Sequence, residues 1–475
     1  MMSSRVPDWV PIVLRLPLRV PIAVVVAALG AAAAQAGWLA EPLGLPRPAE
    51  LTLGIVFVAA TLWLTEAVPL FVTSLVILAL ELVWLSPLLA TAGQGSTLFL
   101  NAFFSDVTLL FLGGFVLSAA IERTRLDRYI SRLILRRVGQ TPQRVVFAMM
   151  LATSLLGVWM SNTAACALML GPAASMLARV PAGDGFRKAL LLGIAFSANL
   201  GGLATPVSSP PNAIVMRYLE AEGAAPSFGG WMAIAVPLLV VLQLVLLVYL
   251  GRRFPSQVAT IELEDVEPPP FRGPQALVLV VFVLTVAGWI SGDALALSSG
   301  TVALLPIVVF FGANLLRTPD LRNLPWDVIL LIGGGLALGA AVDQSGLASW
   351  AGRLLPVDGI PPFLLLGVVA VFAVLVSSVM SNTAAVNLLA PIVMGIGGVS
   401  HASVLIVAAF ACTLSMPMPV STPPNAMAYG FSVSPDGEGE LTTRDMIGPG
   451  LFITIVGLGM LALFTAFWFP YFLVF

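Results

Sequence analysis

The sequence predicts an all-α polytopic membrane protein with about eleven transmembrane helices and two re-entrant hairpins, arranged as an inverted repeat with broken helices. Three observations predict this fold. Of the 475 residues, 59% are hydrophobic and 10% are charged, whereas soluble domains have about 45–50% apolar and about 25% charged residues. Ser-Asn-Thr interrupts an apolar stretch at 161–163 and again at 381–383. Pro-Pro-Asn follows each copy, at 210–212 and 423–425.

Apolar runs near or above the roughly 18 residues that cross a bilayer recur along the whole chain. We expect spans near residues 21–40, 51–66, 68–86, 107–121, 187–216, 231–250, 274–290, 301–316, 327–342, 402–430 and 447–469. With a cytoplasmic N-terminus, only Arg47, Arg217 and Arg353 of the 22 Lys and Arg residues fall outside. Because basic residues accumulate on the cytoplasmic side, we expect this orientation in a bacterial inner membrane. The basic residues before the first span imitate a signal peptide, but the many later spans favour an uncleaved helix.

The densest basic cluster, residues 122–144, contains apolar residues at helical spacing between its arginines. This pattern predicts a helix near 123–138 that lies on the cytoplasmic membrane surface. A plain positively charged loop is the alternative. A second cytoplasmic loop, residues 251–273, divides the chain near its middle.

The apolar stretch 145–178 contains no charged residue, and its Ser-Asn-Thr divides it into arms of about sixteen and fifteen residues. Each arm is shorter than the roughly 20 residues of a membrane-crossing helix. Residues 361–399 repeat the pattern. The basic residues stay on the cytoplasmic side only if both segments leave the membrane on the side they entered. We therefore predict re-entrant hairpins with buried tips.

A second pair of matches follows the hairpins. Residues 206–213 and 419–426 share the pattern P-V-S-[ST]-P-P-N-A, and double prolines break a membrane helix. Upstream, residues 105–126 resemble residues 326–347, each with an early Asp and central glycines. The order of helix, hairpin and broken helix therefore occurs twice with opposite orientation. Such inverted repeats are typical of secondary transporters, with the substrate at the repeat interface.

The motif residues suit both a cation and an anion. Small oxygen-bearing side chains and freed carbonyls suit sodium, and the N-terminal ends of half-helices suit an anion. No Lys, Arg, Asp or Glu occurs in the four motif windows, which argues against a proton relay there. Polar residues also join membrane helices without any transport role. For a doubled motif in an inverted repeat, we favour a binding site.

The paired motifs, together with "WLTEAVPL" at 63–70, resemble the divalent anion:sodium symporter family, which includes bacterial dicarboxylate transporters. The similarity runs from about residue 50 to the end. The resemblance implies a homodimer in which a transport part moves past a scaffold part, as in an elevator. It implies this division: scaffold helices 1–104, first repeat core 105–228, scaffold helices and cytoplasmic loop 229–325, second repeat core 326–446, and a C-terminal helix 447–475.

The resemblance also implies site residues. The substrate-binding residues would be Asn162, Thr163, Ser209, Asn382, Thr383, Thr422 and Pro423. The first sodium site would use Ser161, Asn162 and backbone near Ser208, and the second Ser377, Ser381, Asn382 and backbone near Ser421. One position departs from the family pattern. Where the second half has the hydroxyl of Ser377, the first half has Gly157, which weakens the first sodium site.

We therefore expect a secondary transporter that imports small divalent anions, most of all the C4-dicarboxylates succinate, malate and fumarate, coupled to sodium ions. A sodium-independent dicarboxylate exchanger is the main alternative. Transport of sulfate, citrate or arsenite and sodium/proton antiport stay open. No cluster of catalytic residues supports an enzyme, and no nucleic-acid partner is expected. For Glu66 and Glu81, within the second and third spans, we expect structural partners within the scaffold or at its interface, with proton coupling as the less favoured interpretation.

Overall fold

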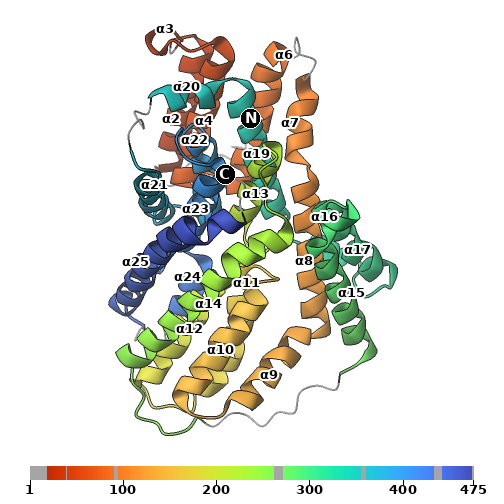
Figure 1. The fold of residues 1–475 in the computed structure, drawn as a ribbon, viewed down its shortest axis with the longest axis vertical. Coiled ribbons are helices and arrows are strands. Elements are labelled where there is room, and N and C mark those ends of the chain that lie inside the picture. The colour runs from red at the N-terminus through yellow and green to blue at the C-terminus, as the bar shows by residue number, and fades with distance from the viewer. Residues whose placement is uncertain are drawn as a thin grey trace, which may run out of the picture.

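The computed structural model describes residues 19–38, 40–89, 95–261, 271–354, 360–432 and 441–472. Arg5 and Arg15, and residues 262–270 of the expected cytoplasmic loop, lie outside these described residues. Within the described ranges the chain is helical and contains no strand, which confirms the all-α prediction (Figure 1).

The helices follow one another in two series that mirror the predicted repeat. Up to the middle of the chain they are α2 (Arg19–Gln35), α3 (Ala40–Leu43), α4 (Arg47–Thr65), α5 (Leu70–Leu80), the π-helix η1 (Glu81–Leu85), α6 (Ser86–Leu89), α7 (Gly95–Phe103), α8 (Asp106–Thr124), α9 (Leu126–Val138), α10 (Pro142–Gly157), α11 (Asn162–Leu177), α12 (Gly185–Gly201), α13 (Pro210–Ala221) and α14 (Phe228–Arg253). The remainder are α15 (Gly273–Ile290), α16 (Gly292–Leu295), α17 (Ser299–Gly312), α18 (Thr318–Arg322), α19 (Trp326–Gln344), α20 (Leu347–Leu354), α21 (Pro362–Ser377), α22 (Asn382–Val393), α23 (His401–Thr413), α24 (Pro423–Ser432), α25 (Thr443–Phe467) and the 3-10 helix η3 (Phe469–Tyr471).

Seven helical stretches within the described residues are long and apolar enough to cross a membrane. They coincide with seven of the eleven expected spans: 51–66, 68–86, 107–121, 231–250, 274–290, 327–342 and 447–469. The other four are present in shorter or interrupted form. α2 and α17 occupy the expected spans at 21–40 and 301–316, and the spans at 187–216 and 402–430 are broken.

Both hairpins and both broken helices form where the motifs predict them. α10 and α11 are joined through residues 158–161, and α21 and α22 through residues 378–381. α12 ends at Gly201 and α13 begins at Pro210, while α23 ends at Thr413 and α24 begins at Pro423. Proline lacks a donor N–H and is tolerated at the first turn of a helix, so each Pro-Pro pair sets the start of the second half.

The two halves interlock at these breaks. α24, from the second half, packs against α11 and α12 of the first, and α13 packs against α22 and α23 in return. The thiol of Cys166 donates a hydrogen bond to the carbonyl of Pro424 at 3.6 Å. The helix that follows each unwound segment therefore packs against helices of the other repeat.

Two glycine-bearing helices connect this centre to the outer helices. α8 packs against α17 and α15, and α19 packs against α5 and α4. A Cβ placed on Gly113 would lie 2.6 Å from the Cβ of Ala303, and one on Gly334 would overlap the Cβ of Ser74. Both positions are closer than a van der Waals contact, so glycine permits these helices to approach so closely.

A turn at Arg125, with φ of 59°, separates α8 from the amphipathic helix α9. α9 starts three residues later than the predicted surface helix and ends where predicted, which confirms a helix over a plain loop. Its counterpart in the second half is the shorter α20, after α19. Figure 1 shows α9 and α20 at opposite ends of the molecule. The two ends are called the α9 face and the α20 face below.

Candidate functional site

Four helix N-termini meet the interrupted segments at the centre of the molecule. α11 begins at Asn162, α22 at Asn382, α13 at Pro210 and α24 at Pro423. The first amides of a helix have no intrahelical acceptor and carry partial positive charge, which suits an anion. The four helices that end at the same segments, α10, α12, α21 and α23, present carbonyls, which suit a cation.

The serines of the two tips are helix caps. Ser161 Oγ accepts a hydrogen bond from the Ala164 amide at 3.2 Å, and Ser381 Oγ accepts one from the Ala384 amide at 3.2 Å. The cap fixes where α11 and α22 begin and leaves each serine oxygen a second lone pair. Thr163 and Thr383 follow in the first turns of α11 and α22 and are half-buried.

A chain of amide side chains joins the first tip to the second repeat. Asn162 Nδ2 donates to Asn199 Oδ1 on α12 at 3.4 Å. Asn199 Nδ2 then donates to Thr422 Oγ1 and to Asn425 Oδ1, both at 3.0 Å. Two of these residues, Asn162 and Thr422, were predicted as site residues. Asn199 was missed, although an Asn in an apolar helix two residues before the break is a signal that the sequence contains.

The second tip is held within its own repeat. Ser377 Oγ donates to Asn382 Oδ1 at 2.6 Å and to the Cys412 carbonyl at 3.1 Å. The first contact brings together two of the oxygens predicted for the second sodium site, those of Ser377 and Asn382. In the first half, Gly157 packs instead against Gly201 of α12, whose own Cβ would lie 3.2 Å from the Cα of Gly157.

The asparagines of the two Pro-Pro-Asn motifs hold the unwound segments. Asn212 Nδ2 donates to the carbonyls of Gly202 and Thr205, both at 2.8 Å. Asn425 Nδ2 donates to the carbonyls of Met416 at 3.0 Å and Met418 at 3.1 Å. Asn212 Oδ1 is buried and has no hydrogen-bond partner among the described residues. A bound cation would satisfy this oxygen.

The remaining predicted residues line the unwound segments. The hydroxyl of Ser208 donates to the carbonyls of Gly202 and Thr205, and that of Ser421 donates to the Met418 carbonyl. Both hydroxyls therefore stabilise the backbone that was predicted to bind sodium. Ser209 is buried as the N-cap residue of α13, and Pro423 is exposed at the start of α24. No group of three or more His, Cys, Asp or Glu side chains forms a metal cluster among the described residues.

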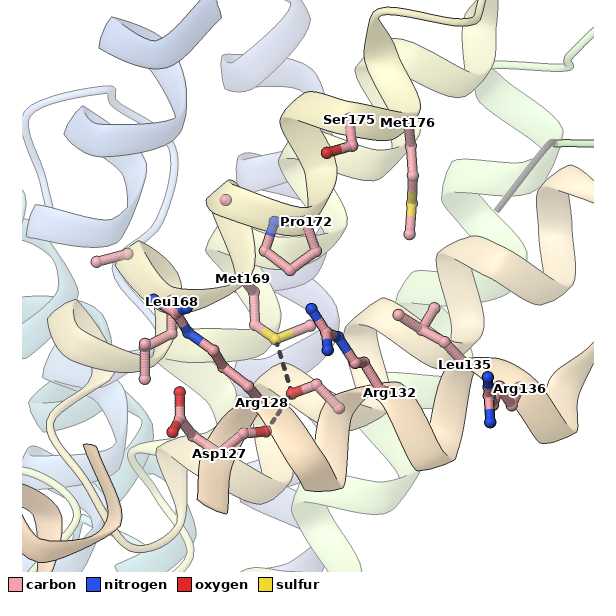
Figure 2. A pocket seen from close by; sticks show the side chains of 13 residues that line it. Asp127, Arg128, Arg132, Leu135, Arg136, Leu168, Met169, Pro172, Ser175 and Met176 are labelled. Carbon is pink, nitrogen blue, oxygen red and sulfur yellow. Dashed lines mark hydrogen bonds between the residues drawn. The ribbon is translucent and has the colours of Figure 1, made fainter. Parts of the chain in front are cut away.

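A basic cavity of about 520 Å³ lies on the α9 face, between α9 and the second arm of the first hairpin. Its lining includes Arg128, Arg132 and Arg136, spaced four residues apart on α9. Figure 2 shows Arg128 and Arg132 extending from α9 toward the hairpin arm that carries Pro172 and Ser175. Burial raises the pKa of Asp127 at one end of this cavity, against the opposing effects of its amide hydrogen bond and nearby arginines. The three arginines give the lining of this cavity its basic character.

Comparison with known proteins decides the family. Residues 60–403 match the family model of the citrate transporters. The chain belongs to this family. The sodium-dependent dicarboxylate transporter SdcS of Staphylococcus saprophyticus is 29% identical over 91% of this chain and 88% of its own length. An uncharacterised transporter of Schizosaccharomyces pombe is 30% identical over 86% of this chain and 49% of its own length. The resemblance to divalent anion:sodium symporters is thus confirmed, and the members are transporters rather than enzymes.

Solved structures support the fold of this citrate transporter family member. The YdaH transporter of Alcanivorax borkumensis aligns with a TM-score of 0.58 at 14% identity, over 78% of this chain and 87% of its own. The MtrF efflux pump of Neisseria gonorrhoeae aligns with a TM-score of 0.57 at 12% identity, over 96% of this chain and 95% of its own. At these identities the likeness concerns the fold alone.

Proposed function

We propose that this protein imports C4-dicarboxylates, namely succinate, malate or fumarate, together with sodium ions. One observation carries the proposal. Four helix N-termini and four helix C-termini converge on segments 157–163, 201–213, 377–383 and 413–426, and these segments contain no charged side chain. N-terminal amides with Asn and Thr donors offer hydrogen bonds to two carboxylates, while the carbonyl ends offer oxygens to sodium.

The two tips have separate roles in this proposal. Asn162 and Thr163 bind one carboxylate, and Asn382 and Thr383 bind the other, with Ser209, Thr422 and Pro423 completing the substrate site. Sodium binds beside each tip, at Ser161 and Asn162 with the carbonyls near Ser208, and at Ser377, Ser381 and Asn382 with the carbonyls near Ser421. The orphaned Asn212 Oδ1 adds an oxygen to the first of these sites. The chain of hydrogen bonds through Asn199 supports a site that spans both repeats.

Charge compensation favours coupling to sodium. Moving one uncompensated charge across the membrane costs about 2.3 kcal/mol per 100 mV, and the site contains no basic side chain to offset a dianion. Bound sodium offsets this charge and orders the tips.

We further propose a homodimer with elevator motion, an inner-membrane location and a cytoplasmic α9 face, where the basic cavity attracts anions. The arginines of α9 on that face agree with the positive-inside rule.

Sodium-independent exchange of dicarboxylates is the second candidate, because Gly157 offers no side-chain oxygen to the first sodium site. Uptake of labelled succinate into proteoliposomes separates the two. Import requires a sodium gradient and no internal substrate if the protein is a symporter. Equal uptake in sodium and in choline, dependent on internal dicarboxylate, would make it an exchanger. The same assay with labelled sulfate, citrate and arsenite in place of succinate tests the other substrates.

A further inference from the structure

The three arginines that line the basic cavity are not part of the proposed substrate site. Arg128, Arg132 and Arg136 follow one another at intervals of four residues, so they lie along one side of α9, about 6 Å apart along the helix axis. Arg128 and Arg136 are exposed, and Arg132 is half-buried. A guanidinium has five N–H donors in a planar fork that fits phosphate oxygens, and it can bind a phosphate beside a partner that it already has.

The opposite wall of the cavity belongs to α11 and is mainly apolar. Its side chains are those of Leu168, Met169, Pro172, Ser175 and Met176. Figure 2 shows this wall across the cavity from the arginines. A free phosphate ion would contact only the basic wall, whereas a phospholipid would place its phosphate on the arginines and its glycerol backbone on the apolar side. The volume of about 520 Å³ lies in the range of about 300–1,000 Å³ that is typical of sites for organic molecules.

One acidic residue also lines the cavity. Asp127 is 2% exposed and directly precedes Arg128. Figure 2 shows Asp127 at one end of the row and Arg136 at the other, and the nine residues between these positions correspond to about 13.5 Å along a helix. The carboxylate opposes an anion mainly at Arg128, so we expect a bound phosphate between Arg132 and Arg136.

The cavity lies away from the tip of the first hairpin. α11 begins at Asn162, and Pro172 follows ten residues later, which is about 15 Å along a helix. Among the described residues, the α11 part of the lining begins at Ala167 and therefore excludes the Ser-Asn-Thr motif. A ligand in this cavity is thus distinct from a substrate bound at the tips.

α9 is suited to the surface of a membrane. It is amphipathic, with the cavity arginines on one side and Ile130, Leu133 and Ile134 on the other. Figure 1 shows it at one end of the molecule. Amphipathic helices with basic polar sides lie at the boundary between headgroups and acyl chains. Basic pockets beside membrane helices on the cytoplasmic side bind the headgroups of anionic lipids.

We propose that the basic cavity binds the headgroup of an anionic phospholipid, with the phosphate diester held by Arg132 and Arg136 and the glycerol backbone against the apolar wall of α11. Arg128 adds to the attraction. The bound lipid contacts both α9 and the first hairpin, so it stabilises their packing. Each arginine beside an anionic lipid strengthens binding by about fivefold, so loss of all three should weaken it by more than about tenfold.

Thermal unfolding of the purified protein in detergent tests the proposal, with phosphatidylglycerol or phosphatidylcholine added. Both lipids contain a phosphate diester, but only phosphatidylglycerol has a net negative charge. We expect phosphatidylglycerol to raise the Tm of wild type more than phosphatidylcholine does. The triple variant Arg128→Gln, Arg132→Gln, Arg136→Gln should lose this difference. Arg137→Gln, on the same helix but outside the described lining, is the control and should keep it. An undiminished difference in the triple variant would overturn the proposal.

A second pair of variants alters the cavity from the α11 side. Ser175→Glu places a carboxylate across from the arginines, where it binds them and repels a phosphate. Ser175→Gln has nearly the same shape without the charge and is the matched control. Ser175 is exposed, so both variants should fold. We expect the affinity for phosphatidylglycerol, measured by mass spectrometry of the intact complex, to fall by about tenfold in Ser175→Glu and to change little in Ser175→Gln. Equal affinities in the two variants would contradict a headgroup site here.

Two soluble anions separate the lipid from other ligands of the same arginines. Glycerol 3-phosphate has the phosphate and glycerol without acyl chains, and succinate is the proposed substrate. We expect any effect of either anion on the Tm to be the same in wild type and in the triple variant. If glycerol 3-phosphate stabilises wild type as strongly as phosphatidylglycerol and has no effect on the triple variant, the cavity binds free phosphate and the lipid proposal is wrong. If instead the triple variant loses an effect of succinate, the arginines bind the substrate and the proposal is equally wrong. None of these measurements requires the protein to transport succinate.

Discussion

The two unwound segments at the centre of the molecule are related by the inverted repeat, yet their surroundings differ. Val207 in the first segment is 6% exposed, whereas its counterpart Val420 in the second is 84% exposed. Val207 contacts the glycine helix α8 beside Gly114, where a Cβ would lie 3.4 Å from the Val207 Cβ. α24, which follows the second segment, packs against α11 and α12. From this difference in exposure we expect the site to open toward the α9 face.

The polar networks of the two halves differ as well. The first tip is tied to the second repeat through Asn199, whose counterpart in the second half is Cys412. Cys412 donates to the Ala373 carbonyl, at 3.7 Å, and Asn212 Oδ1 has no partner among the described residues, whereas Asn425 Oδ1 accepts from Asn199. The second tip is tied to Ser377 of its own hairpin, where the first half has Gly157. The two halves therefore have equivalent backbones but different side-chain hydrogen-bond donors.

The largest expected effect comes from the tips themselves. Asn162→Ala and Asn382→Ala should each abolish succinate uptake, because a hydrogen bond to a charged group contributes about 1.5–3 kcal/mol and each Asn also orders its tip. Both residues are half-buried, so the variants should fold. Uptake and thermal unfolding of purified protein are the two measurements. A folded variant with wild-type uptake would show that this tip does not bind the substrate and that the two halves are not functionally equivalent.

Accessibility tests the open face directly. In a background with Cys166 and Cys412 replaced by Ala, Val420→Cys should react with a membrane-impermeant thiol reagent at least ten times faster than Val207→Cys, because only Val420 is exposed. The reagent should act from the cytoplasmic side of inverted vesicles. Faster labelling of Val207→Cys would mean that the protein in the membrane favours the opposite state.

Asn199→Ala tests the link between the repeats. It removes both hydrogen bonds to Thr422 and Asn425, and loss of about 1.4 kcal/mol corresponds to a tenfold change. We expect uptake to fall by about tenfold, with a smaller loss of thermal stability. Cys412→Ala, at the equivalent position of the other half, is the matched control and should change uptake by less than twofold. Equal losses of uptake in the two variants would show that the difference between Asn199 and Cys412 does not affect transport.

The membrane spans and the repeated motifs were predictable from the sequence, whereas side-chain contacts that occur in one half only were not. Two copies each of Ser-Asn-Thr and Pro-Pro-Asn located both hairpins and both breaks to within a few residues. Asn199 occurs in one half only, so the repeat gave no signal for it. The capping roles of Ser161 and Ser381 depend on backbone geometry at the tip. Likewise, Gly157 was interpreted as a missing ligand, and only the structure shows that it packs against Gly201.

The smallest expected effect concerns this glycine. Gly157→Ser would restore the hydroxyl that Ser377 provides in the other half, and an added oxygen ligand should strengthen the first sodium site. A Cβ at this position would lie 3.3 Å from the Ala198 carbonyl, so α10 must shift by a few tenths of an ångström. We therefore expect a modest change, a two- to threefold lower sodium concentration for half-maximal uptake, at about 0.6 kcal/mol by the same free-energy conversion. Gly157→Ala adds the same Cβ without the oxygen and is the control: it should raise the sodium requirement or leave it unchanged. If Gly157→Ala and Gly157→Ser change the sodium requirement equally, the glycine is needed only for packing against Gly201. A hydroxyl at this position would then not strengthen the first sodium site.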